Sequence, residues 1–87
     1  MNEITFWKNM TIDKINEIGK TKSEVEKGLK KINKMLENPQ ITQQEKEKLT
    51  RMRNKHLALI IEYVFTKYYL KQEVEVLEKK YEQKLVN

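Results

Sequence analysis

The residue with the widest chemical repertoire in this chain is its only histidine, His56. A histidine can serve as a general base or as a pH-sensitive group. The apolar spacing Leu49, Met52, His56, Leu59 places it on the seam of a helix, and no carboxylate stands four residues away. Its neighbour Arg53 is basic. The pattern favours a packing residue over a catalytic one.

Three glutamates, Glu75, Glu78 and Glu82, fall on one face of a predicted helix, as carboxylate ligands do in di-metal bundles. Such bundles also need Glu-x-x-His pairs, and no histidine follows these glutamates. The chain has no cysteine, no glycine-rich phosphate loop and no nucleophile next to a base and an orienting group. We therefore expect no enzyme activity, no catalytic residue, no metal site and no cofactor.

A cluster of basic residues near the middle of the chain is the stronger candidate for a binding site. Residues 20–56 contain 11 basic and 5 acidic side chains, a net charge of +6 in a chain whose net charge is +5. This charge could steer an acidic protein partner, contact nucleic-acid phosphates or form a solvated surface. The candidate partner or nucleic-acid contacts are Lys27, Lys30, Lys31, Lys34, Lys46, Lys48, Arg51, Arg53 and Lys55.

The composition of this cluster favours a protein partner over sequence-specific DNA. Acidic residues interrupt it, and no recognition helix of the helix-turn-helix type can be marked out. Of the 18 basic residues 16 are lysine, whereas base recognition favours arginine. The lysine bias is also typical of AT-rich coding, which is common in low-GC bacteria and their phages and plasmids.

The elements that must position these residues are helices. Pro39 disfavours helix in the residue before it, which predicts a turn over 38–42. Thr42 and Glu45 form a capping box that starts a helix at about residue 43. Because no glycine or proline follows, this helix should run to about residue 85.

The arm before the turn, about 3–37, is also predicted to be helical. Its apolar residues are spaced by threes and fours: Ile15, Ile18, Val25, Leu29, Ile32 and Leu36. Gly19 weakens the helix, and Thr21 or Ser23 could cap a new one. We therefore expect a kink or break near 19–23, giving either one bent helix or two shorter ones.

Together these signals predict one all-α domain over 1–87: an antiparallel helical hairpin with a kinked or broken N-terminal arm and one long C-terminal helix. The chain has only 2 glycines and 1 proline, and 36% of its residues are charged. This composition favours an all-α fold over a sheet. Folding at Pro39 should place residues whose numbers sum to about 79 side by side.

The most apolar segment, 57–70, predicts self-association. Eleven of its fourteen residues are apolar or aromatic and surround the helix, whereas one antiparallel neighbour covers a single stripe. A homodimer in the form of a four-helix bundle would cover the rest. Alternatives are another protein on this face, or a monomeric three-helix bundle made by a broken N-terminal arm. The expected dimer interface is Leu57, Ile60, Ile61, Val64, Phe65, Tyr68 and Tyr69.

Two aromatic residues near the N-terminus need a docking surface. Phe6 and Trp7 should pack on Tyr69, Leu70 or Val74, or on a partner. Segment 57–70 is shorter than the roughly 20 apolar residues of a membrane span, and no signal peptide is evident at the N-terminus. We expect a cytoplasmic protein with no membrane contact and no small-molecule substrate.

The function that these features predict is protein binding. We expect a dimeric regulator or inhibitor of phage or plasmid type that binds a larger protein through its lysine-rich end. One alternative is an accessory protein that binds nucleic acid through the same end, and another is a structural or assembly protein that needs the aromatic end.

The length and hairpin plan resemble the small secreted hairpins of type VII secretion systems, whose central turn carries Trp-x-Gly. In this chain Trp7 is followed by Lys8 and Asn9 and lies far from Pro39. The resemblance therefore covers the architecture and carries no function with it.

Overall fold

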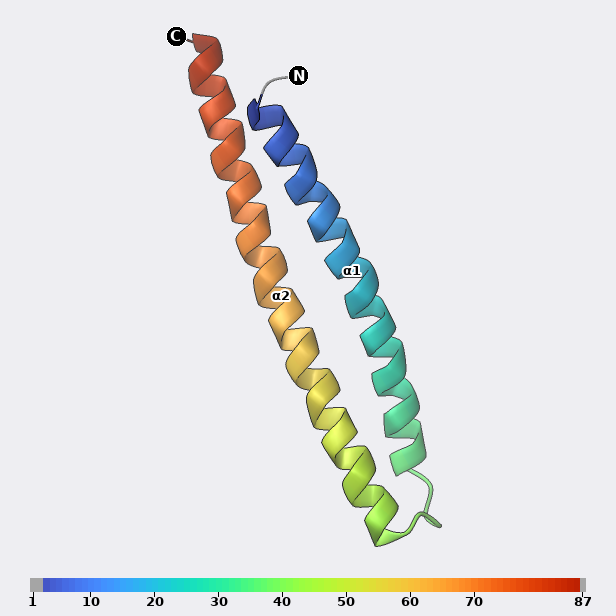
Figure 1. Ribbon diagram of the computed structural model, residues 1–87. Helices are drawn as coiled ribbons and strands as arrows, with labels where there is room; N and C mark the ends of the chain where they lie inside the picture. The colour runs from blue at the N-terminus through green and yellow to red at the C-terminus, as the bar shows by residue number, and fades with distance from the viewer. Residues whose placement is uncertain (1–2, 87) are drawn as a thin grey trace.

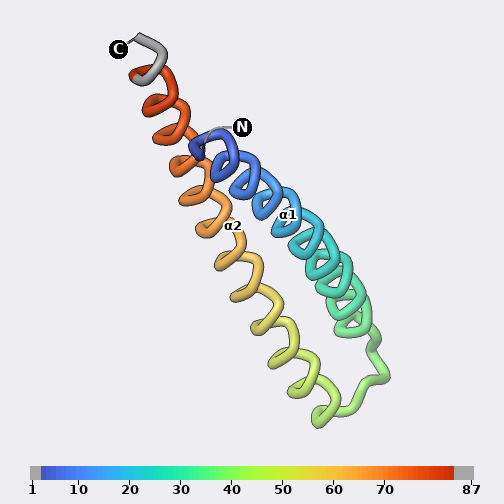
Figure 2. The backbone as a smooth tube through the Cα atoms, turned by 45° about the horizontal axis from the view of Figure 1, so that its top comes forward, coloured from blue at the N-terminus to red at the C-terminus, as the bar shows by residue number. Residues whose placement is uncertain are grey.

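The computed structural model describes residues 3–86, with side chains through residue 83, as two long helices. Helix α1 spans Glu3–Leu36 and helix α2 spans Gln43–Val86, and they lie antiparallel in a hairpin of 69 × 17 × 14 Å (Figure 1). The connection lies at one end, and the start of α1 and the end of α2 lie at the other (Figure 2). The predicted all-α hairpin is confirmed.

The start of α2 follows the predicted capping pattern. The backbone N–H of Glu45 donates to Thr42 Oγ1 at 3.1 Å, and that of Lys46 donates to the Thr42 carbonyl at 3.0 Å. A threonine before a helix satisfies N–H groups that have no partner in the first turn. Thr42 therefore sets the first residue of α2.

The side chain of Asn38 stabilises the turn that connects the two helices. The N–H of Gln40 donates to Asn38 Oδ1 at 3.0 Å, which forms a turn around Pro39. No described residue has a positive φ, so α1 ends without a left-handed residue. Backbone bonds from Glu37 to the carbonyls of Asn33 and Lys34 finish its last turn.

Of the two alternatives predicted for 19–23, the break into two helices is wrong, because α1 is one uninterrupted helix. Thr21 does not cap a new helix: its Oγ1 donates to the Glu17 carbonyl one turn earlier, at 3.1 Å. Lys22 Nζ pairs with Glu26 Oε1 at 2.9 Å across the same region. Gly19 lowers helix propensity, but packing along the whole of α2 outweighs that local preference.

The two helices meet along a seam of half-buried residues in the four-three spacing of a coiled coil. Thr11 and Ile32 are the only buried residues among those described, so the core is thin. The seam of α1 consists of Ile4, Lys8, Thr11, Ile15, Ile18, Lys22, Val25, Leu29, Ile32 and Leu36. That of α2 consists of Leu49, Arg53, His56, Ile60, Tyr63, Lys67, Leu70, Val74 and Leu77.

The register of the hairpin differs from the predicted one. Lys8 Nζ pairs with Glu78 Oε1 at 3.0 Å, and the position of a Cβ on Gly28 would lie 3.0 Å from His56 Nε2. Facing residue numbers thus sum to about 84–86 rather than 79. An extended loop residue advances about 3.3 Å against 1.5 Å in a helix. The connection therefore carries the chain past the end of α1 before α2 begins (Figure 1).

The seam also corrects the predicted surroundings of His56. Leu49 and His56 lie on it, but Met52 and Leu59 are exposed on the flank, and Arg53 and Ile60 take their places. The reason lies further along α2, where Leu70, Val74 and Leu77 continue the row of Ile60 and Tyr63. A row through Met52 and Leu59 would instead continue through Thr66 and Glu73.

Candidate interaction surfaces

The most apolar part of α2 does not face α1. Leu57, Ile61, Val64, Phe65 and Tyr68 are 42%, 56%, 49%, 58% and 56% exposed. Four of them directly follow seam residues, and one residue turns a helix by about 100°. The exposed row therefore lies at nearly a right angle to the contact with α1.

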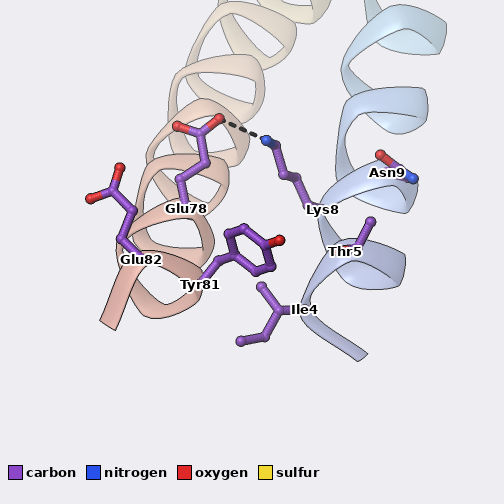
Figure 3. A pocket seen from close by; sticks show the side chains of 7 residues that line it. All are labelled: Ile4, Thr5, Lys8, Asn9, Glu78, Tyr81 and Glu82. Atoms are coloured by element: carbon purple, nitrogen blue, oxygen red, sulfur yellow. Dashed lines mark ion pairs between the residues drawn. The ribbon is translucent and has the colours of Figure 1, made fainter. Parts of the chain in front are cut away.

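A hollow at the open end of the hairpin shows which side of α1 lies next to the exposed row of α2. It has a volume of about 470 Å³ and is lined by Thr5 and Asn9 of α1 and by Glu78 and Glu82 of α2 (Figure 3). Thr5, Asn9 and Glu78 each follow a seam position by one residue, and Glu82 lies one turn beyond Glu78 on the same side of α2. We call the surface made of such residues on both helices the second face.

The α1 part of the second face carries no charge from residue 5 to residue 23. Its residues are Thr5, Asn9, Ile12, Asn16, Gly19 and Ser23. The charged residues of this stretch lie elsewhere on α1, either at the seam positions Lys8 and Lys22 or on the outer and opposite flanks. By the register, the apolar row of α2 lies level with about residues 17–28 of α1, where the second face carries Gly19, Ser23 and Glu26, and Glu26 is paired with Lys22.

The residues predicted for a dimer interface divide into three groups in the structure. Leu57, Ile61, Val64, Phe65 and Tyr68 lie on the second face or at its edge. Ile60 is half-buried in the seam with α1 and is not available to a partner. Tyr69 lies further around α2, is 64% exposed, and packs its ring edge-on against Tyr68 at 5.8 Å.

The basic cluster surrounds the turn end of the hairpin. Eight of its nine predicted residues are exposed, four on α1 and four in the first turns of α2. Among them Lys30 follows the seam residue Leu29 and lies on the second face. Arg53 is the exception, because it occupies a seam position and its Nε is buried without a hydrogen-bond partner. The structure therefore separates Arg53 from the exposed members of the cluster.

A small apolar hollow within the basic end was not predicted. It has a volume of about 300 Å³ and is lined by Ile32 and Met35 of α1 and by Leu49 and Met52 of α2. Lys48 and Glu45 stand at its edge, and Met35 is 55% exposed. The signal that could have revealed it is the pair of methionines directly before two seam positions, Leu36 and Arg53.

His56 is held as a packing residue. Its Nδ1–H donates to the Met52 carbonyl at 2.9 Å, one turn earlier in α2. The other side of the ring occupies the space left by the absent side chain of Gly28. This environment orients the imidazole toward α1.

The aromatic residues near the N-terminus lie at the open end. Phe6 and Trp7 are 51% and 49% exposed, and their rings pack edge-on at 5.6 Å. The Lys8–Glu78 ion pair places Trp7 and Phe6 level with about residues 79 and 80, roughly 14–15 Å along the axis from Leu70 at 1.5 Å per residue. Packing on Tyr69 or Leu70 of the same chain does not fit this register.

Two of the three glutamates considered as metal ligands are placed in the structure by features of the open end, and Glu75 is exposed. Glu78 pairs with Lys8, and Glu82 lines the hollow at the open end (Figure 3). Across the part of the chain that the structure describes, no three potential metal ligands gather in one place. Neither described helix combines the length and apolarity needed to span a membrane.

Comparison with known proteins finds no match to this chain among family models, curated proteins or solved structures.

Proposed function

We propose that this chain is a non-enzymatic protein-interaction module that dimerises through its second face and binds a larger, acidic protein through its lysine-rich turn end. The observation that carries the proposal is the exposed apolar row of α2 between Leu57 and Tyr68. In this view the protein is a small regulator or inhibitor of the kind that phages and plasmids encode.

The energy at stake in the exposed row supports a dimer. Five large side chains at about half exposure forgo on the order of 4–7 kcal/mol, at about 1.5–3 kcal/mol for full burial of each. That is comparable to the stability of a small domain. The right angle between the row and the seam also fits a square four-helix bundle, in which each helix contacts two neighbours.

The charge distribution supports an acidic protein as the target. Lys48 lines the apolar hollow of Ile32, Met35, Leu49 and Met52, and Lys31 and Lys34 line a neighbouring hollow that shares Met35. An acidic segment with one apolar side chain would find both a charged rim and an anchor site there. Nucleic acid would use the rim alone.

The dimer is tested by sedimentation of the purified chain over a wide concentration range. We expect twice the chain mass for the wild type and for Met52→Ser with Leu59→Ser, which lie on the opposite flank. Ile61→Ser with Phe65→Ser should give a helical monomer or a chain with less helix, as circular dichroism will show. A wild type that stays monomeric at high concentration would overturn the proposal.

The target surface is tested by charge reversal. Lys31→Glu, Lys34→Glu and Arg51→Glu together should abolish capture of the protein partner from native lysate while leaving helicity and dimer mass unchanged. A matched variant reverses Lys14, Lys79 and Lys80, which are exposed, lie away from the turn end and outside the second face, and change the net charge equally. Equal loss in both variants would contradict a specific surface at the turn end.

Nucleic acid is the second candidate because the exposed lysines of both helices converge at one end. Binding of a labelled DNA duplex should then fall steeply between low and moderate salt, since phosphate contacts release counterions. A flat titration, or binding that the turn-end charge reversal leaves unchanged, would eliminate this candidate.

A further inference from the structure

The second face of α2 has a centre, and the centre lies near the middle of the helix. Its apolar residues Leu57, Ile61, Val64 and Tyr68 are symmetric about the point between Ile61 and Val64. Since α2 spans residues 43–86, two copies that pack around this point overlap along almost the whole helix.

The same spacing of threes and fours continues the row in both directions with polar residues. Toward the turn the row contains Asn54, Thr50, Glu47 and Gln43. Toward the open end it contains Lys71, Glu75, Glu78 and Glu82. These residues decide the orientation of a second copy, because the apolar centre fits either way.

A parallel arrangement in which α2 of one copy packs directly on α2 of the other would place every residue of the row opposite its own copy. All five charged residues would then face a like charge: Glu47, Lys71, Glu75, Glu78 and Glu82. Like charges at directly facing positions are destabilising. The two turn ends, each with a net charge of +6 over residues 20–56, would also lie side by side.

An antiparallel arrangement removes nearly all of these conflicts. Lys71 then faces Asn54, Glu75 faces Thr50 and Glu82 faces Gln43. Only Glu47 and Glu78 remain as a like pair, and Glu78 is already paired with Lys8 at 3.0 Å within its own hairpin.

Side-chain volume leads to the same orientation. In the antiparallel arrangement Leu57 faces Tyr68, and Ile61 faces Val64. The row beside them places Phe65 of one copy between Ala58 and Glu62 of the other, whereas the parallel arrangement would place two Phe65 rings opposite each other. Residues 71–82 of one copy, with three basic and four acidic side chains, then lie along the basic half of its partner.

We propose that the partner on the second face is a second copy of this chain in antiparallel orientation, with the two-fold axis between Ile61 and Val64. This inference rests on the dimer proposed above and adds its geometry. The two lysine-rich turns then lie at opposite ends of the bundle, about 59 Å apart between the two Gln43 residues at 1.5 Å per residue. Such a dimer presents two separate target sites and can bridge two target molecules.

Spin-label distances test this orientation directly, since the chain has no native cysteine and single-cysteine variants are specific. Lys48→Cys lies 14.5 residues from the proposed axis, which predicts an intermolecular distance of about 44 Å along the bundle. Glu62→Cys lies level with the axis and serves as the matched control. Both positions are exposed and outside the second face.

We expect a long distance for the label at residue 48 and a short one, on the order of one to two helix diameters of about 10 Å, at residue 62. Short distances at both positions would establish a parallel dimer and overturn the orientation while leaving the dimer intact. No intermolecular distance at either position would overturn the dimer itself.

Discussion

The contact between Gly28 and His56 makes a sharp prediction about stability. A Cβ placed on Gly28 would lie 3.0 Å from His56 Nε2 and 3.3 Å from Cδ2, closer than side chains normally approach. A Cβ on Gly19 would meet nothing within 4 Å. The two glycines share a helix and differ in this respect, so Gly19→Ala is a matched control for Gly28→Ala.

The magnitudes follow from helix propensity and one hydrogen bond. Gly19→Ala should raise the free energy of unfolding by about 0.8–1 kcal/mol, and the melting temperature by about 4–8 °C per kcal/mol. Gly28→Ala gains the same propensity but displaces the imidazole from its 2.9 Å bond to the Met52 carbonyl. That bond contributes about 0.5–1.5 kcal/mol, so the net change should be close to zero.

The assay is urea unfolding followed by circular dichroism at one protein concentration. In the His56→Ala background Gly28→Ala should recover its full gain, giving a coupling free energy of about 1 kcal/mol between the two sites. If Gly28→Ala stabilises the native protein as much as Gly19→Ala does, His56 does not occupy the space beside Gly28. The register between α1 and α2 would then be wrong.

Three further substitutions test other parts of the hairpin. Thr42→Ala should destabilise the protein by about 1 kcal/mol because it removes the cap of α2, whereas Thr50→Ala, inside the helix, should not; equal effects in thermal unfolding would contradict the cap. Arg53→Met should raise the free energy of unfolding by about 1 kcal/mol because Nε is buried without a partner, and a loss of stability would show that the guanidinium is satisfied. Lys8→Met should change stability by less than about 0.5 kcal/mol, since both members of the Lys8–Glu78 pair are partly exposed; a larger loss in urea unfolding would mean that this pair determines the register.

Local signals were sufficient for the helices and their ends. Thr42 and Pro39 mark the start of α2 and the turn because capping and proline geometry act within a few residues. The row from Ile15 to Leu36 is the actual seam of α1 because only one apolar stripe runs along that helix. Lys22 interrupts the stripe in the sequence and holds the same place in the structure.

The continuity of α1 and the seam of α2 depended on tertiary packing. Glycine propensity at residue 19 is a local term of about 1 kcal/mol, and the pairing of one long helix with another outweighs it. Segment 57–70 is apolar on nearly every side, so its own residues do not select which side meets α1. That selection comes from Leu70, Val74 and Leu77, which extend only one of its rows along the full helix and leave the row from Leu57 to Tyr68 exposed.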